Sequence, residues 1–139
     1  MTRTIGIVIA ALMFVAAPAR AQDAEMVASA QAASQAWLAL TDSGAYSQSW
    51  EQSASVFQAA VSQSSWATTI QGVRLPLGAL KSRLVKSATL TRSLPGAPAG
   101  EYVVIQYETQ FEHKANAIET VTPVRERDGS WKVSGNYIK

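Results

Sequence analysis

The stretch YVVIQYETQF, residues 102–111, alternates apolar and polar side chains over most of its length. A period of two is typical of a β-strand with one face in the core and the other face toward water. We therefore predict a strand over 102–111 with one apolar face. The residues of that face are Val103, Ile105, Tyr107 and Phe111.

Three further strands are expected beside it, over 84–92, 117–127 and 131–138. The first would place Leu84, Ala88 and Leu90 on one side, and a turn near Lys114–Asn116 would precede the next. Asp128-Gly129 predicts a hairpin turn before the last strand, because both residue types tolerate positive φ. A two-residue turn there would put Val124 opposite Val133, a bulged turn is the alternative, and the register stays open.

The chain before these strands changes to a helical period. Three apolar stripes recur in steps of three and four residues, which places each stripe on one helix face. Ser49 and Gln52 form a candidate capping box for the second helix, and Pro76 should end or kink the third helix at Leu75. The stripes are Met26, Ala30, Ala33, Trp37 and Leu40; Trp50, Ala54, Phe57 and Val61; and Trp66, Ile70, Val73 and Leu77.

Helices followed by an antiparallel meander indicate an α+β fold, with three N-terminal helices packed on a curved four-stranded sheet. Large apolar side chains on the helix stripes and on the inner strand face should form its core. The expected structural core is Trp37, Trp50, Phe57, Trp66, Ile70, Ile105 and Phe111.

The first 21 residues have the pattern of a secretory signal peptide. Arg3 precedes an apolar run from Ile5 to Ala17, and Ala19-Arg20-Ala21 follows as a small-residue cleavage site. The run is shorter than the roughly 20 residues of a spanning helix, so an uncleaved anchor is the less favoured alternative. We expect a signal peptide over 1–21, one domain over 22–139, a periplasmic or secreted location and no stable membrane anchor after cleavage.

Composition excludes several classes of site. The chain has no cysteine and one histidine, so we expect no disulfide, no Cys/His metal cluster and no cofactor. The formal charge of +2 comes from Arg3 and Arg20 in the leader, which leaves the rest of the chain neutral. A neutral domain gives no reason to expect nucleic-acid binding.

Ordered motifs along the chain resemble those of one bacterial family. The resemblance runs from about Trp37 to Lys139 and includes RLPLG at 74–78, LPGAPAGEY at 94–102 and DGSWKVSG at 128–135. Trp50, Trp66, Arg83, Tyr107, Phe111, Lys114 and Glu119-Thr120 belong to the same pattern.

The family is the "domain of unknown function 4019". The resemblance implies a fold similar to the nuclear-transport-factor-2-like (NTF2-like), cystatin-like group, in which a bent sheet wraps a long helix and forms a cone. That wider group includes isomerases, dehydratases and pure binding modules, so the fold does not decide function.

Candidate binding residues come from aromatic and charged positions. Tryptophans on helix stripes are better explained as core, whereas Trp131 follows a turn and should be the most open of the four. Arg74 and Glu119 lie beside apolar neighbours, so we expect a partly buried pair; a site for a ligand anion is the alternative. The ligand-binding candidates are Arg74, Tyr107, Glu119, Trp131 and Tyr137.

No acid–base set assembles from the sequence, and none of the common catalytic motifs is present. His113 lies at a strand end beside charged residues, where side chains usually reach solvent. We therefore favour a non-enzymatic periplasmic module that binds a small molecule or a protein, and a homodimer stays open. The alternative is a small enzyme of the isomerase or dehydratase type that uses a pocket carboxylate or His113.

Overall fold

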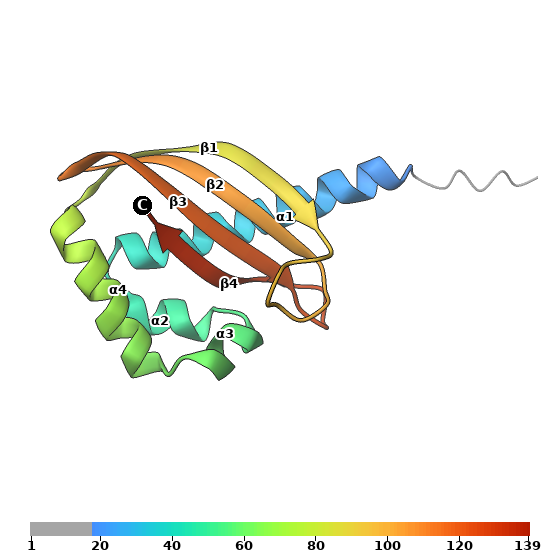
Figure 1. Ribbon diagram of the computed structural model, residues 1–139, viewed down its shortest axis with the longest axis horizontal. Coiled ribbons are helices and arrows are strands. Elements are labelled where there is room, and N and C mark those ends of the chain that lie inside the picture. The colour runs from blue at the N-terminus through green and yellow to red at the C-terminus, as the bar shows by residue number, and fades with distance from the viewer. Residues whose placement is uncertain (1–17) are drawn as a thin grey trace, which may run out of the picture.

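The computed structural model describes residues 18–139 as an α+β protein in which one long helix crosses beneath a curved sheet (Figure 1). All four strands are antiparallel and lie in chain order, β1-β2-β3-β4. The elements are α1 (Ala19–Asp42), α2 (Tyr46–Glu51), α3 (Ser55–Ala60), α4 (Gln63–Leu77), β1 (Leu80–Thr91), β2 (Tyr102–Phe111), β3 (Lys114–Arg125) and β4 (Trp131–Ile138).

The inner face of the sheet packs on α1, which contacts all four strands. The strand over 102–111 is confirmed, and its alternation holds: Val103, Ile105 and Tyr107 are buried, while Glu108 is exposed. The remaining helices form a second group beside α1, in which α2 contacts α1 and α4, and α3 contacts β4 (Figure 1). The core therefore lies between the sheet, α1 and this group of short helices.

Aromatic rings join α1 to the short helices. The rings of Trp37 and Trp66 lie 5.8 Å apart, and Phe57 meets Trp66 edge-on at 5.0 Å. Ser49 connects the same elements, because its backbone oxygen accepts from the Trp37 indole and its hydroxyl accepts from the Trp66 indole. Large rings whose N–H groups are satisfied in this way can be buried without leaving an unpaired donor.

The second expected helix is two helices, α2 and α3, so the structure has four helices where three were expected. Ser49 is not its N-cap, because it lies buried inside α2 with its hydroxyl donating to the Tyr46 carbonyl. Neither α2 nor α3 has a side-chain cap, whereas Ser62 caps α4 by accepting a hydrogen bond from the Ser65 amide.

The last helix also differs from the expected stripe. Pro76 lies in the final turn of α4, and the helix continues to Leu77 before Gly78 ends it. The buried face is Trp66, Ile70 and Arg74, in steps of four, while Val73 is 42% exposed. An arginine thus takes the inward position that the pattern assigned to a valine.

Two bulges in β1 explain why its expected face is wrong. The pairing with β2 shifts between Leu80 and Ser82 and again between Val85 and Ser87, which leaves Lys86 without a partner. A bulge of one residue moves the following side chains to the opposite face. Leu84 is therefore 70% exposed, although Ala88 and Leu90 are half-buried beyond the bulge.

The β2–β3 hairpin differs from the sequence prediction, and the structure gives the register of the β3–β4 hairpin that the sequence left open. The β2–β3 turn is Glu112-His113, because Phe111 pairs with Lys114, and the expected turn near Lys114–Asn116 is part of β3. The β3–β4 turn is longer than two residues. Lys132 lies opposite Val124, and a bulge in β4 follows Val133.

The expected leader falls largely on residues 1–17, which lie outside the described residues. Within residues 18–139, no helix is both long enough and apolar enough to cross a membrane.

Gly78 links the end of α4 to the β2–β3 turn. Its φ of 74° and ψ of −159° lie in a region that only glycine adopts readily. The neighbouring backbone is held tightly, since the His113 amide donates to the Leu77 carbonyl at 2.9 Å. A Cβ at this position would lie 2.9 Å from Glu112 Cβ and from His113 Cδ2.

We expect Gly78→Ala to lower the free energy of unfolding by about 2–3 kcal/mol, because the substitution adds backbone strain and a clash. Urea denaturation measures this change. Gly72→Ala is the matched control: it lies on the exposed side of α4 with open space around it, and it should raise stability by roughly 0.5–1 kcal/mol. Equal effects of the two substitutions would show that Gly78 is not constrained.

Candidate functional site

Arg83 connects three elements at the centre of a buried ionic network. Its Nε donates to Glu119 Oε1 at 2.7 Å, while its two terminal nitrogens donate to the Asp42 carboxylate at 2.7 and 3.0 Å. The side chains of Arg83, Asp42 and Glu119 are 12%, 19% and 1% exposed. A planar guanidinium presents its donors in a rigid fork, so it can bind two carboxylates at once. Arg83 in β1 therefore holds the last residue of α1 and the middle of β3 together.

A second arginine enters the same network from α4. Arg74 donates from one terminal nitrogen to Asp42 Oδ1 at 2.9 Å and from the other to Thr41 Oγ1 at 3.3 Å. Its guanidinium also lies 4.9 Å from the centre of the Phe111 ring, within the range of a cation–π contact. Asp42 is thus shared between the two arginines, which fastens α4 to the end of α1.

The expected pair of Arg74 with Glu119 is wrong. Both residues are buried, at 6% and 0% exposed, but each finds another partner: Asp42 for Arg74 and Arg83 for Glu119. The sequence pattern missed Arg83 because the bulges of β1 decide which of its residues face inward. It missed Asp42 because that residue was interpreted only as part of the stop signal after α1.

Two polar atoms of this network have no hydrogen-bond partner among residues 18–139. They are Nε of Arg74 and Oε2 of Glu119, whose other oxygen also accepts from the Thr109 hydroxyl at 2.7 Å. The opposing charges nevertheless lie in direct contact, which makes their burial tolerable. The network fits a structural clamp, since each of its charged groups is already engaged by an opposite charge.

Burial and charge also perturb the ionisation of two residues in this region. For Arg83, burial alone would lower the pKa, but the hydrogen bonds and charges of Asp42 and Glu119 outweigh it and raise the pKa above its usual value. Burial raises the pKa of Tyr107, and the hydrogen bond with Ser34 offsets this only in part. Arg83 is therefore always a cation, and Tyr107 stays a neutral phenol at physiological pH.

Tyr107 and Ser34 extend the polar contacts toward the middle of α1. Their hydroxyl oxygens lie 2.8 Å apart, and both residues are almost fully buried. Five hollows along residues 18–139 have volumes of about 470 to 630 Å³, and none of them is lined by Tyr107, Arg83 or Glu119. These buried titratable groups therefore do not face any of the five hollows.

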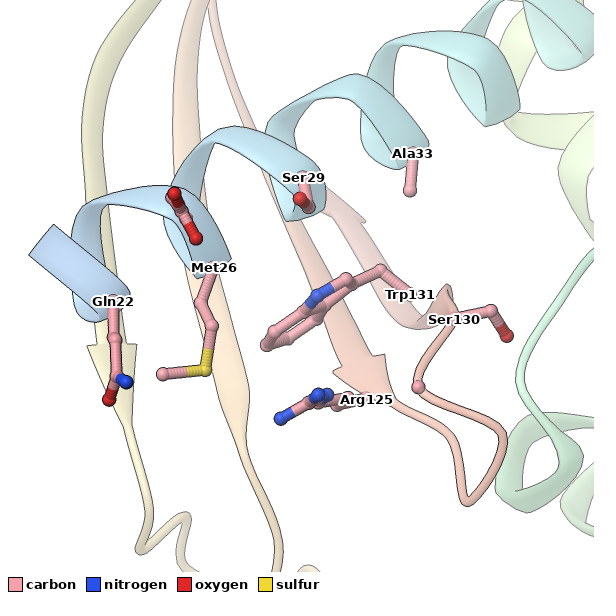
Figure 2. A pocket seen from close by; sticks show the side chains of 9 residues that line it. Gln22, Met26, Ser29, Ala33, Arg125, Ser130 and Trp131 are labelled. Carbon is pink, nitrogen blue, oxygen red and sulfur yellow. The ribbon is translucent and has the colours of Figure 1, made fainter. Parts of the chain in front are cut away.

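Open space lies instead between α1 and the β3–β4 hairpin. A hollow of about 630 Å³ is walled by α1 on one side and by the hairpin on the other. Figure 2 shows Met26 and Trp131 pointing toward each other across it, with Arg125 beside them. Its lining residues are Gln22, Glu25, Met26, Ser29, Ala33, Arg125, Gly129, Ser130 and Trp131.

A second hollow, of about 470 Å³, continues along the same helix. It shares Ala33, Ser130 and Trp131 with the first hollow and extends to Leu40 and α2. Its other lining residues are Ala36, Trp37, Gln48, Gln52, Lys132 and Val133. We name the two adjoining hollows the Trp131 groove, because the indole forms part of the wall of both.

The four tryptophans differ in how their indole N–H groups are satisfied. Trp37 donates to the Ser49 carbonyl and to the Ser53 hydroxyl, Trp50 to the Val61 carbonyl, and Trp66 to the Ser49 hydroxyl. Trp131 is half-buried, and its indole N–H makes no hydrogen bond with any of the residues 18–139. A free donor on an aromatic ring in a groove wall is available to a ligand.

The remaining candidates lie away from this groove. His113 is 60% exposed at the β2–β3 turn, 3.5 Å from the Glu112 carboxylate. Tyr137 is 63% exposed near the end of β4. In the part of the chain that the structure describes, no group of three or more His, Cys, Asp or Glu side chains could hold a metal ion.

Comparisons with known proteins identify a family but no function. A family model described as "Protein of unknown function (DUF4019)" matches residues 33–136, which includes both the ionic network and most of the Trp131 groove. No curated protein and no solved structure matches the chain.

Proposed function

The chain belongs to the DUF4019 family, and we propose that it is a non-enzymatic binding module that holds a small ligand in the Trp131 groove. The observation that carries this proposal is the indole N–H of Trp131, from which no other residue among 18–139 accepts a hydrogen bond, in a wall shared by two hollows. Ligand pockets are usually hollows of about 300–1,000 Å³ with a few polar groups among apolar ones. Both parts of the groove fall within that range and have that mixed lining.

The contacts and positions of the candidate acid–base residues support binding over catalysis. Glu119 is the buried carboxylate that the enzyme alternative would need, but Arg83 and Thr109 already bind its Oε1. A general acid or base must lie within hydrogen-bond reach of a substrate atom. Neither Glu119 nor Tyr107 lines any of the five hollows described above. His113, the other residue of that alternative, lies at an exposed turn and lines none of these hollows.

We also assign the fold to the NTF2-like, cystatin-like group. The support is the bent antiparallel sheet whose inner face wraps the long helix α1 (Figure 1), together with the resemblance of the sequence. In this assignment the inside of the cone is filled by side chains of α1, α4 and the sheet. The ligand would then lie at the flank of the cone, between α1 and the hairpin.

The module is proposed to act in the periplasm or outside the cell. The support is the leader-like pattern of residues 1–21, which would make Gln22 the first residue after cleavage. Cleavage at that point would remove the first three residues of α1 but keep Gln22 and every other residue that lines the Trp131 groove. Mass analysis of the periplasmic fraction should find a chain that begins at Gln22, and a chain that keeps Met1 in the cytosol would contradict export.

Binding in the groove can be tested with anilinonaphthalene sulfonate, a dye whose aromatic rings should stack on Trp131. We expect the folded protein to increase the dye's fluorescence and Trp131→Ala to weaken binding at least tenfold. Ser29→Phe is a second variant, since it fills the groove from an exposed position on α1. Both variants should keep a cooperative thermal transition.

Tyr137→Ala is the matched control, because Tyr137 is an exposed aromatic residue outside the groove. Its dye affinity should stay within twofold of the wild type. The proposed function would be wrong if Trp131→Ala and Ser29→Phe bind the dye as tightly as Tyr137→Ala does.

A further inference from the structure

The Trp131 groove is more polar at one end than at the other. Near the start of α1 its lining is mostly polar, with Gln22, Glu25, Ser29, Arg125 and Ser130 beside Met26. Toward the end of α1 apolar side chains predominate: Ala33, Ala36, Trp37, Leu40 and Val133 line this part together with Gln48, Gln52 and Lys132. Trp131 lies where the two parts meet. A ligand that fills both parts is best matched when its strongest polar group lies at the first end, because polar groups placed against Ala36, Trp37 and Leu40 would find no partner there.

The groove is also elongated. Leu40 lies fourteen positions after Met26 on α1, and at 1.5 Å per position the helix wall between them is roughly 21 Å long. A compact ligand would fill only one of the two hollows. An unbranched chain with a headgroup would fill both, and each methylene removed from water would add to its affinity.

Arg125 provides the donors for such a headgroup. One terminal nitrogen donates to Glu101 Oε1 at 3.1 Å, and the side chain is 45% exposed. A guanidinium carries five N–H donors, so the contact with Glu101 leaves donors to spare for a ligand. Figure 2 shows the guanidinium of Arg125 near the Trp131 ring. Glu25 is the only acidic residue among those that line either hollow.

From this arrangement we infer that the ligand is a free anionic amphiphile, a molecule with a carboxylate at one end and an unbranched alkyl chain at the other. The carboxylate accepts hydrogen bonds from Arg125 and from the indole N–H of Trp131. The chain runs past the Trp131 ring into the apolar part between α1 and β4. This inference rests on the proposed function and specifies the ligand class of the same groove.

Guanidinium and carboxylate match in geometry, which favours an acidic headgroup over a neutral or cationic one. A saccharide would satisfy the polar part and could stack on Trp131, and Gln48, Gln52 and Lys132 could pair with some of its hydroxyl groups farther along. The hydroxyl groups that face Ala36 and Leu40 would still lie unpaired. The apolar part of the groove therefore decides between the two ligand classes.

The inference is tested with dodecanoate, at concentrations below those at which it forms micelles, as a competitor of the bound dye. We expect dodecanoate to displace the dye and its affinity to exceed that of octanoate, by roughly fourfold for each added methylene. Dodecyltrimethylammonium, which has the same chain with a cationic head, should bind at least tenfold more weakly.

Arg125→Gln should weaken dodecanoate binding at least tenfold. Arg92→Gln is its matched control, because Arg92 is an exposed arginine that contacts the same Glu101 but does not line the groove. This control should bind dodecanoate within twofold of the wild type.

Three results would overturn the inference. If dodecanoate leaves the dye in place while dye binding still depends on Trp131, the groove binds a different class of ligand and the proposed function survives. Equal affinity for the anionic and cationic amphiphiles would show that Arg125 selects no headgroup. Sedimentation of the protein with phosphatidylglycerol vesicles, without binding to monomeric dodecanoate, would identify a lipid surface as the partner.

Discussion

The guanidinium of Arg83 determines how the helices meet the sheet. It binds Asp42 at the end of α1 with two nitrogens and Glu119 in β3 with the third. Moving three charged groups out of water is costly, and the loss is offset only when their geometry lets every charge face an opposite one. The two arginines and two acids meet this condition, with Asp42 shared between Arg74 and Arg83. The end of α1 cannot move relative to β1 or β3 without separating these charges.

The end of α1 is held against the sheet by these charges, and the space available for a ligand lies on another side of the helix. Tyr107 lies opposite Glu119 in the sheet and is hydrogen-bonded to Ser34 of α1, and the rings of Trp37 and Trp66 pack against each other in the same core. Between α1 and the β3–β4 hairpin, side chains meet less closely and leave the Trp131 groove. One face of α1 thus packs against the core, and another face forms a wall of the Trp131 groove. The stability of the fold and the proposed binding therefore both depend on α1.

The sequence predicted most of the elements but few of the polar contacts. Alternation at 102–111 and the tryptophans at helical spacing report on burial, which is a local property that the residue pattern encodes. The partners of Arg83 and Arg74 depend on the bulge at Lys86 and on the rotation of α4, which places Arg74 instead of Val73 inward. A shift of one residue in which side chain faces inward cannot be predicted from the spacing of the apolar residues. The place of Trp131 after a turn predicted a partly open side chain, and the structure shows it half-buried, as it also shows Trp50. Arg125, Met26 and the rest of the groove are brought to Trp131 only by the fold.

The measurement that tests the central role of Arg83 most directly is the urea unfolding of Arg83→Met at neutral pH, beside Arg92→Met. Methionine keeps most of the apolar stem of Arg83 but leaves Glu119 buried without a cation, so we predict a loss of about 3–5 kcal/mol in the free energy of unfolding. Arg92 is 61% exposed in its ion pairs, and its loss should cost at most about 1 kcal/mol. If the two variants unfold at similar urea concentrations, Arg83 does not hold the helix to the sheet.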